Sequence, residues 1–557
     1  MIQQYLFAAE ADRIQDWLFR ASRLREVVGG SQLLSKFCKK IKKELQQKWK
    51  LTDDQILVCD GGAFRLCFHD EVACRDFGRA LSDEYFVETG GTLSVADEFP
   101  VFDPNNSASF TTANAVAHTA LRRAKARGIP TIASAHLPLI GVCASCGSGL
   151  AWIFAGLPDV PREVKNYLCR ECEQKANRQN RRGFLKQFET IISGLENDET
   201  RKTLQCTLKP EVIGRLDQRG YVAYLKADGN AFGELFQRCE NPAVLKELSA
   251  ELTNILWQSL AEPGRLMLET LENAARKKTR NAKPTGDSIP LLPLIVAGDE
   301  CFFLLPAPWS LDFASRFCLA FEERMATLVE KLNLVRAGEK ATLSAAIVIC
   351  KATYPHKLAH RRAERLIALA KQHSRQSDAM TSLICFEVVQ GSSMVNDGAV
   401  GENGYRCSMQ PYGASDDSKS ETLSLDRLTK ARDDLRRLPK TPLQKMRALF
   451  DEPPASPADV DDWWSPKLRR VLDRVGRLEA DAPADQNGLT EHESKGHRQR
   501  LQDALSALSL DGTKEGGYWG RAKRDNFSTY LQGFPDLIGA WRYACPIDQP
   551  AVEDPED

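Results

Sequence analysis

Apolar and polar positions alternate along residues 220–390 in an order that predicts a sheet packed with helices. Short apolar runs at Tyr221–Ala227, Leu292–Ala297 and Cys301–Leu305 are bounded by Gly, Pro or Asp, which is typical of buried strands, and the last two form a hairpin. Helical periodicity runs from Ala243 to Arg276 and is interrupted at Pro263-Gly264. A helix, a strand, a helix and a strand follow at Leu311–Leu332, Ala341–Cys350, His356–His373 and Ser382–Val388. This order predicts one sheet covered by helices on one face.

Residues 1–138 follow the same order of elements without repeating the letters. A strand at Ile2–Ala9 precedes two helices that we expect to break at Gly29-Gly30, and "QILVCDGGAFRLCFH" forms a hairpin with Asp60-Gly61-Gly62 at its turn. A helix, the strand "GTLSVADEF", a helix at Thr111–Arg127 and the strand "IPTIAS" complete the unit. The sequence therefore predicts a duplicated unit, of which only the second copy carries two adjacent acids at its hairpin turn.

The C-terminal part is predicted to be helical. Gly391–Glu421 is rich in Gly, Ser and Asp, which favours a long mobile loop, and Glu479–Gly488 marks a further linker. "LSLDRLTKARDDLRRL" and "SPKLRRVLDRVGRL" are amphipathic with basic faces. We favour a helical bundle that packs on the preceding domain, and docking to a neighbouring subunit or to RNA is the alternative.

Composition and charge narrow the class of protein. Lys+Arg and Asp+Glu both number 75, so any contact with nucleic acid has to rest on local patches or partner subunits. The length of 557 residues predicts three or four domains. The beginning of the sequence has no basic region followed by an apolar run, and no stretch approaches a membrane span. Several of the 16 cysteines, such as Cys67, Cys301 and Cys350, are single residues in apolar runs, so we expect most of the cysteines to be reduced, buried thiols in a cytoplasmic protein.

Four cysteines have a different pattern. Cys143-x-x-Cys146 and Cys169-x-x-Cys172 are two pairs separated by 22 residues, and two such knuckles complete a tetrahedral four-thiolate shell for structural zinc. Four free cysteines in loops would leave the paired spacing unexplained. The basic run Lys175–Lys186 follows, and we favour a solvated helical face over an RNA contact.

Three carboxylates are candidates for metal chemistry. Asp228 ends the first strand of the second unit, and Asp299 and Glu300 occupy the hairpin turn, so the three meet at one edge if the first strand lies beside the hairpin. Three carboxylates can hold two Mg²⁺ or Mn²⁺ ions about 3.5–4 Å apart for phosphoryl transfer. The alternative is that Gly298-Asp299 only supplies the backbone freedom of a turn.

Further residues around these acids suit a phosphate ligand. Gly229 removes a side chain where backbone approaches the ion or a triphosphate, and the helix opening at Asn230–Gly233 offers N–H groups to an anion. Lys371 and Arg375 lie one turn apart on a predicted helix and can clamp phosphates, although such pairs usually mark a solvated face.

On these residues the chain resembles the large catalytic subunit of type III CRISPR effector complexes, the palm-domain polymerase/cyclase of the "Cas ten" family. The likeness covers nearly the whole chain, from "RIQDWLFRASRLREVVGGSQLLS" through the four-cysteine insertion and the second palm to the helical tail. The GGDD turn of the family is here Ala297-Gly298-Asp299-Glu300. "ATLSAAIVICKATYPHKLAHRRAERLIALAK" is similar to the segment that follows that turn.

The resemblance implies an α+β fold with two ferredoxin-like, GGDEF-like palm domains, an inserted zinc ribbon and a helical C-terminal domain. The expected boundaries are 1–138 for the first, degenerate palm, 139–215 for the zinc-ribbon and helical insertion, 216–390 for the catalytic palm and 391–557 for the loop and helices. Many family members begin with a histidine-aspartate nuclease domain, whereas this sequence starts in the palm, so we expect no DNase activity of that kind.

The resemblance also implies conversion of ATP into cyclic oligoadenylate for antiviral defence, with CRISPR RNA, other type III subunits and a target RNA trigger as partners. Asp299 would be the principal metal ligand, and Lys371 and Arg375 would grip the triphosphate. Ala297, Glu300 and Asn230 depart from the family pattern, which bears on rate and metal preference more than on reaction type. The alternatives are a non-catalytic RNA- and subunit-binding scaffold and a stand-alone cyclase that uses another nucleotide, such as GTP.

Overall fold

The structure is a computed structural model. It describes residues 3–128, 141–156, 165–177, 182–193, 205–278, 288–334, 339–377, 379–389, 405–406, 408–417, 421–436, 438, 440–451, 465–480, 496–510, 520–524 and 527–549. The expected strand "IPTIAS", the linker beyond 480, most of the basic loop at 277–288 and most of the loop at 391–421 lie outside these residues.

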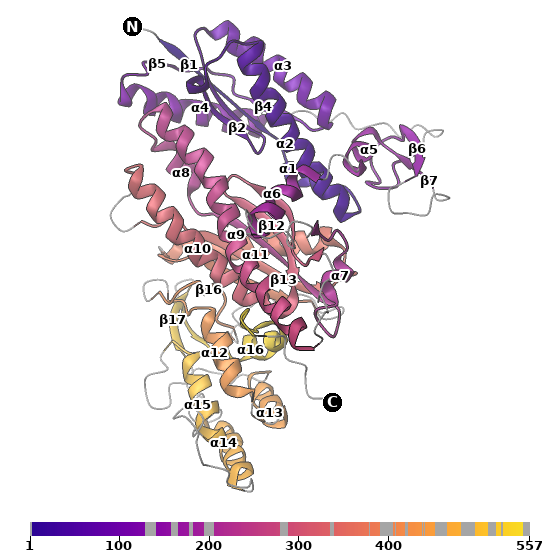
Figure 1. The fold of residues 1–557 in the computed structure, drawn as a ribbon. Helices are drawn as coiled ribbons and strands as arrows, with labels where there is room; N and C mark the ends of the chain where they lie inside the picture. Colours follow the sequence, from indigo (N-terminus) through magenta and orange to yellow (C-terminus); the bar gives the residue numbers. More distant parts are fainter. Residues whose placement is uncertain are drawn as a thin grey trace.

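The central sheet has the order β11-β12-β9-β13-β14-β16. Figure 1 shows this sheet between the N-terminal sheet and the C-terminal helices. Its strands are β9 (Tyr221–Gly229), β11 (Leu292–Ala297), β12 (Glu300–Pro306), β13 (Leu343–Lys351), β14 (Leu383–Val388) and β16 (Tyr412–Gly413). β9 pairs antiparallel with both β12 and β13, and β13 pairs parallel with β14. The first strand therefore lies beside the hairpin, as the sequence predicts.

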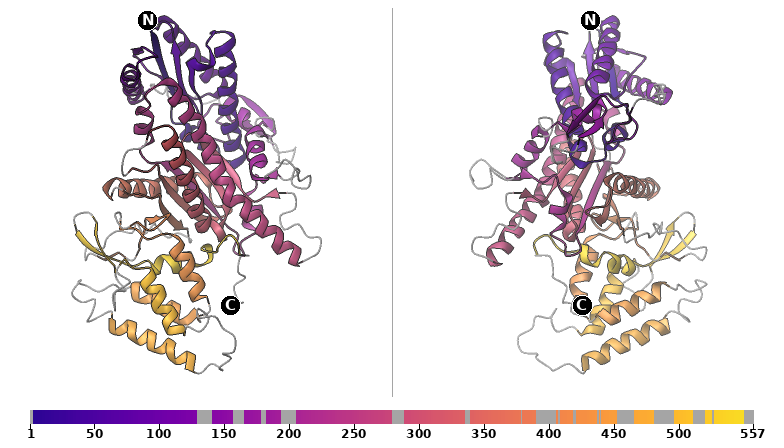
Figure 2. Two further views of the ribbon diagram at one scale, coloured as in Figure 1. Left: turned by 60° about the vertical axis from the view of Figure 1, so that its left-hand side comes forward. Right: turned by 90° about the vertical axis from the view of Figure 1, so that its right-hand side faces the viewer.

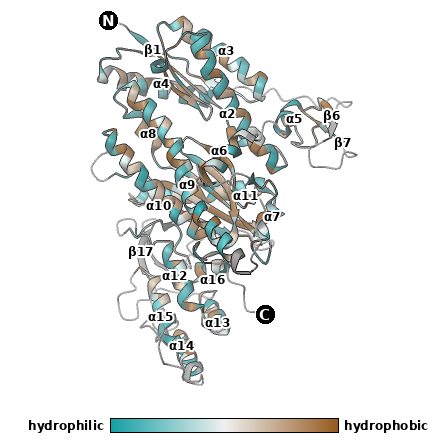
Figure 3. Cartoon of the chain, in the orientation of Figure 1, coloured by the Kyte–Doolittle hydropathy of each residue, from teal (hydrophilic) through white to brown (hydrophobic). Residues whose placement is uncertain are grey.

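Helices cover both faces of this sheet, and the expectation of a single covered face is wrong. Phe303 of β12 stacks on Phe313 of α10 (Ser310–Lys331), with ring centroids 6.0 Å apart. Its neighbour Phe302, on the other face, contacts His360 of α11 (His356–Ser377) at 5.2 Å. The physical reason is that β9 and β13 are apolar almost throughout, which is typical of strands buried on both sides (Figure 3).

The predicted interruption at Pro263-Gly264 is also wrong, because α9 runs continuously from Pro242 to Lys278. A proline inside a helix costs about 3 kcal/mol. Here the flanking Leu260 and Met267 are buried, and this packing offsets the cost. Gly264 allows close approach, since a Cβ there would lie 2.8 Å from Cδ1 of Ile192 in α6 (Arg182–Ser193).

The N-terminal sheet repeats the strand order of the central sheet. Its order is β2-β3-β1-β4, with β5 also on β1, and β1 is antiparallel to both β3 and β4. Its elements are β1 (Gln4–Ala11), α1 (Ile14–Phe19), α2 (Leu24–Gln47), β2 (Ile56–Asp60), β3 (Ala63–Phe68), α3 (Glu71–Thr89), β4 (Leu93–Val95), β5 (Val101–Phe102) and α4 (Ser107–Arg127). This order corresponds to β11-β12-β9-β13 of the central sheet, so the predicted repetition is present for these four strands.

The expected break at Gly29-Gly30 is wrong, because α2 passes through both glycines. They serve packing instead: a Cβ on Gly29 would lie 1.9 Å from the carbonyl oxygen of Lys175 in α5 (Arg170–Ala176). The chain breaks its helix earlier, between α1 and α2. The expected strand "GTLSVADEF" is shorter than predicted, because only Leu93–Val95 forms β4, and the separate strand β5 follows it.

The remaining elements form a small side module and a C-terminal end. The module contains β6 (Ile153–Gly156), β7 (Lys165–Leu168) and α5, and β8 (Gln205–Cys206) and α7 (Pro210–Gly214) lead into the central sheet. The C-terminal end contains α12 (Asp426–Leu435), α13 (Lys440–Asp451), α14 (Ser465–Ala480), α15 (His497–Ala507), α16 (Phe534–Ala540), and the strands β15 (Tyr405–Arg406), β17 (Gly520–Arg524) and β18 (Phe527–Leu531).

The views agree that the N-terminal sheet and the C-terminal helices lie at opposite ends of the central sheet (Figure 2). The C-terminal end is joined to the start of α10, where the Ile547 N–H donates to Asp312 at 2.8 Å and the Cys545 N–H donates to the Pro308 carbonyl at 3.0 Å. Of the helices in the described residues, none has the length and apolar character to cross a membrane.

Candidate active site and four-cysteine cluster

The backbone brings the three predicted acids to one edge of the central sheet. The antiparallel register of β9 and β12 places Glu300 directly opposite Asp228, and the Gly229 N–H donates to the Asp299 carbonyl at 3.1 Å. Gly298 adopts φ +59°, a left-handed conformation that a glycine accepts without strain. Ala297 is outside the left-handed region, so the alanine in place of the family glycine is accommodated without backbone strain.

Asp228 is paired with a cation from α11. The Lys371 Nζ lies 2.8 Å from the Asp228 Oδ2, and both side chains are partly exposed at the sheet edge. Arg375 lies one turn further along the same helix and is exposed. The predicted basic pair therefore faces the acids through Lys371, and Arg375 extends the positive charge outward.

The surroundings of Asp299 change the pKa of its carboxyl group. Burial, followed by the negative charge of Asp228, raises the pKa of Asp299 to about 7, and the charge of Lys371 opposes this rise. Gly229 makes room for this carboxyl group, because a Cβ there would lie 2.7 Å from the Asp299 Oδ2 and 2.3 Å from Phe232. Two facing carboxylates of this kind are a donor set that suits a divalent cation.

Glu300 is held by two residues that the sequence analysis did not identify. Its Oε1 accepts hydrogen bonds from the Gln15 Nε2 of α1 and, at 2.6 Å, from the Lys226 Nζ of β9. The sequence could have pointed to Lys226, because a lysine inside the apolar run "YVAYLKADG" is buried with the strand and a buried cation needs a charged partner. Gln15 had no such signal, because it lies 285 positions away in the sequence.

Lys226 is the centre of a buried charge cluster behind the acids. Only 1% of its side chain is exposed, and its Nζ contacts Glu300, Glu364 and, at 3.4 Å, the His360 Nε2. Burial alone lowers the pKa of Lys226, but the charges of Glu300 and Glu364 raise it above its ordinary value. Burial, and then the charge of Lys226, lowers the pKa of His360 to about 3, so this ring is neutral.

Two other predicted ligand residues have structural contacts. The Asn230 amide donates to the Thr342 Oγ1 at 3.0 Å and accepts from the Ser344 Oγ at 2.8 Å, which ties it to β13. Gly233 lies in α8 (Phe232–Gln237) and faces α4, where a Cβ would be 3.8 Å from His118. Within the described part of the chain, the three acids do not form a cluster with all donor atoms within 4.8 Å of one another.

The four predicted cysteines do form such a cluster. The Sγ atoms of Cys143, Cys146, Cys169 and Cys172 all lie within 4.8 Å of one another, and the Gly149 N–H donates to the Cys146 Sγ at 3.2 Å. This is the donor set and spacing of a closed tetrahedral metal site. The cluster is therefore able to bind a metal ion, and it leaves no open position for a substrate.

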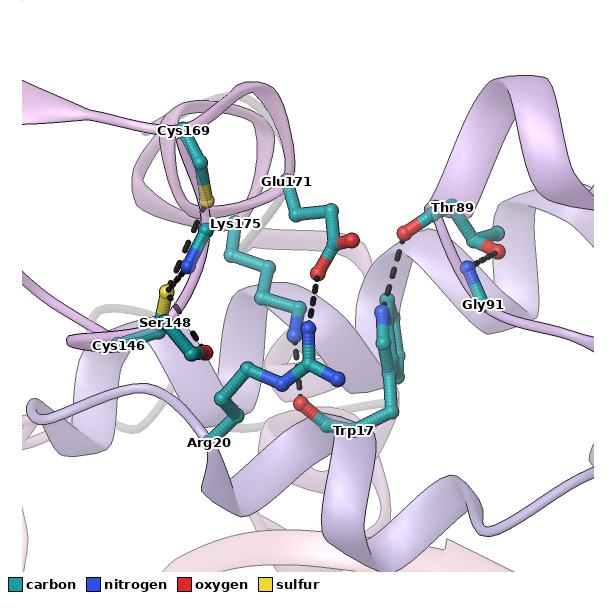
Figure 4. Close-up of polar contacts among 10 residues, drawn as sticks. Trp17, Arg20, Thr89, Gly91, Cys146, Ser148, Cys169, Glu171 and Lys175 are labelled. Atoms are coloured by element: carbon teal, nitrogen blue, oxygen red, sulfur yellow. Dashed lines mark hydrogen bonds and ion pairs between the residues drawn. The ribbon is translucent and has the colours of Figure 1, made fainter. Parts of the chain in front are cut away.

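The cysteine module docks on α1 and α2 through α5 (Figure 4). The Lys175 Nζ is buried, donates to the Trp17 carbonyl at 2.7 Å and lies 3.8 Å from the Trp17 ring centroid. Burial lowers the pKa of Lys175 to about 8, against the charge of Glu171. Arg20 approaches Glu171 at 3.4 Å, and the Ser145 hydroxyl donates to the buried Glu26.

The mostly antiparallel central sheet thus carries carboxylates at the end of β9 and on the adjacent hairpin turn. Residues 221–381 match the family model described as Cas10/Cmr2, second palm domain. This segment of the chain is therefore similar to the second palm domain of the Cas10/Cmr2 family.

Solved structures with a similar fold include a Csm1–Csm4 cassette in complex with AMPPNP, with 12% identity, a TM-score of 0.49 and coverage of 98% of this chain and 70% of that chain. A cassette in complex with cA4 has 13% identity, a TM-score of 0.42 and coverage of 71% and 55%. Csm1 in T.onnurineus has 12% identity, a TM-score of 0.41 and coverage of 71% and 54%. In the last two comparisons, the match spans little more than half the length of the solved chain.

No curated protein matches the sequence. The likeness to the Cas10/Cmr2 family rests on the sequence match of residues 221–381.

Proposed function

We propose that the chain is a Mg²⁺- or Mn²⁺-dependent nucleotidyltransferase that converts ATP into cyclic oligoadenylate in CRISPR-type antiviral defence. The observation that carries the proposal is the register of β9 and β12, which sets Glu300 opposite Asp228 with Asp299 on the turn beside them. The match of this segment to the Cas10/Cmr2 second palm supports it.

Each acid has a role in this proposal. Asp228 and Asp299 would hold the divalent ions, with Glu300 as the third ligand. When bound, two such ions activate an attacking ribose hydroxyl and neutralise the leaving pyrophosphate. Asp299 gives up its proton to accept the cation, because its raised pKa keeps it partly protonated near neutral pH in the metal-free protein.

The neighbouring residues would bind the nucleotide. Lys371, which now pairs with Asp228, would bind the triphosphate, and Arg375 on the same helix would add a bidentate contact. Gly229 and Gly298 carry no side chains at this edge of the sheet, and the segment from Asn230 to Gly233, which leads into α8, would border the phosphates.

The domain organisation in this proposal follows the repeated strand order. Residues 1–138 would be a first palm without catalytic acids, 139–215 a zinc-ribbon and helical insertion, 216–390 the catalytic palm, and 391–557 the C-terminal loop and helices. Zinc in the four-cysteine cluster would be structural. We infer that the protein works in the cytoplasm with other type III subunits and CRISPR RNA, and that target RNA is its trigger.

The contrasting candidate is a non-catalytic scaffold that binds RNA and partner subunits. The observation that favours it is that Asp228 and Glu300 are already paired with Lys371 and Lys226. A third candidate is a cyclase that uses GTP, because Asp228, Asp299 and Glu300 would bind metal ions and would not distinguish one nucleobase from another.

Incubation of the full chain with Mg²⁺ or Mn²⁺ and each nucleoside triphosphate, with and without target RNA, separates the three candidates. A cyclic adenylate product that is lost in Asp299→Ala/Glu300→Ala supports the proposal. Nucleotide binding without product under every condition identifies the scaffold, and product from GTP alone identifies the third candidate. Asp16→Ala, at an exposed residue, is the control variant and should retain the activity of the wild type.

A further inference from the structure

The two carboxylate oxygens of Glu300 have different surroundings. Oε1 accepts from both Gln15 and Lys226, whereas among the described residues Oε2 has no hydrogen-bond or ion-pair partner. The side chain is 23% exposed, so part of it is accessible to solvent. One oxygen is therefore fixed by two donors, and the other is available.

Lys226 cannot move away easily from this position. Its Nζ is fixed by Glu300 and Glu364, and the neutral His360 lies beside it. The His360 ring is itself stacked on Phe19 at a centroid distance of 4.0 Å and abuts Phe302 at 5.2 Å. The Lys226 ammonium group is thus held by two carboxylates and by a histidine ring that is itself packed between phenylalanine rings.

Gln15 reaches the acid from the N-terminal sheet unit, and α1 is held against the central sheet by further contacts. Phe19, one turn along α1, packs edge to face on Phe302 at 5.3 Å. The Ser31 hydroxyl of α2 donates to the Leu294 carbonyl of β11 at 2.6 Å. The two hairpin turns also meet, since a Cβ on Gly61 would be 3.1 Å from the Ala297 Cβ.

We propose that Gln15 and Lys226 are positioning residues that orient Glu300, holding its Oε1 so that its Oε2 faces the divalent cation. Ligating carboxylates are commonly fixed in this way by hydrogen bonds to their second oxygen, and loss of such a partner costs about 10–100-fold in metal affinity. This inference rests on the proposed function, because the cation is the one assigned to Asp228 and Asp299.

A consequence is that the N-terminal unit completes the site of the second unit. Its own hairpin turn has no pair of adjacent acids, but the unit supplies Gln15 to Glu300 and contacts the other turn through Gly61. The site around Asp228, Asp299 and Glu300 is then formed by the two units together. Separation of the units would leave Glu300 without one of its two hydrogen-bond donors.

The test is Mn²⁺ binding to the full chain without nucleotide, followed by electron paramagnetic resonance, with the melting temperature measured in parallel. Gln15→Ala is expected to weaken the site about tenfold with an unchanged melting temperature. Asp16→Ala, an exposed neighbour on the same helix, is the matched control and is expected to bind as wild type. Lys226→Met is expected to weaken the site at least as much.

A double variant shows whether Gln15 acts through Glu300. Gln15→Ala combined with Glu300→Gln is expected to bind Mn²⁺ no more weakly than Glu300→Gln alone. Wild-type affinity in Gln15→Ala, with binding abolished in Asp299→Asn, would overturn the positioning role and leave the proposed function standing. If Asp299→Asn also binds as wild type, the metal site itself is wrong and the positioning role falls with it.

Discussion

Replacement of Asp299 by asparagine should stabilise the metal-free protein, and the effect should depend on pH. In the folded state the carboxyl group is partly buried and faces Asp228, which together raise its pKa to about 7 from an ordinary value near 3.8. Folding therefore favours its protonated form. The wild type loses stability relative to Asp299→Asn as pH rises from about 4 to about 7, and the difference is constant above that range.

The magnitude follows from the pKa. A rise from 3.8 to about 7 corresponds to about 4 kcal/mol between the two protonation states. The side chain is partly exposed, so solvent screening reduces this figure, and we expect about 2 kcal/mol at pH 8. For a unit of 150–250 residues this is a rise in Tm of about 4–8 °C.

The assay is calorimetry of both proteins in magnesium-free buffer that retains zinc, at one scan rate and at several values between pH 5 and pH 8.5. At pH 5 the difference between the two Tm values should be smaller than at pH 8, because the wild type has lost only part of this stability there. Addition of Mg²⁺ should raise the Tm of the wild type and not that of Asp299→Asn, because only the wild type binds the ion. An asparagine variant that is less stable than the wild type at pH 8 without Mg²⁺ would refute the reasoning.

Three further predictions concern packing and the cysteine cluster. Elemental analysis of the purified protein should find about one zinc per chain. Replacement of all four cysteines by serine should remove the zinc and lower the Tm, and zinc retained by that variant would contradict the site. Ala231 adopts φ +57°, so Ala231→Gly should raise stability by about 1 kcal/mol in thermal unfolding, and a loss would mean that this backbone relaxes in solution. Gly29→Ala should destabilise the protein by at least about 2 kcal/mol and expose the cysteine module to proteolysis, because the new Cβ would meet the Lys175 carbonyl. Gly539→Ala is the matched control, since a Cβ at Gly539 meets open space. Equal effects of the two substitutions would rule out the packing argument.

The sequence was sufficient to predict the features that depend on local patterns. The apolar runs around Gly298 predict a hairpin, and the pairing of β9 with β12 confirms the edge at which Asp228 and Glu300 meet. Paired Cys-x-x-Cys spacing predicts a cluster because each knuckle fixes two thiols locally. The repeated order of strands was equally visible, since alternation of strand and helix periodicity is a property of each segment alone.

Features that depend on distant packing were not predictable in this way. Gly29-Gly30 and Pro263 are helix breakers by propensity, yet both helices continue through them because neighbouring elements pack against them. Gln15 reaches Glu300 only because the two units pack together, and no local signal in "RIQDWLF" predicts that contact. Lys226 was visible as a cation in an apolar strand, but its partners were not.

The central claim is that Asp228 and the turn at Asp299 bind divalent cations for nucleotidyl transfer. Crystals of the full chain soaked with Mn²⁺ and a non-hydrolysable ATP analogue test it directly through anomalous scattering at the manganese edge. The account predicts two peaks about 3.5–4 Å apart between Asp228 and Asp299, with Lys371 moved from Asp228 to the phosphates. Manganese peaks only at other positions, with the Lys371–Asp228 pair intact, would contradict it.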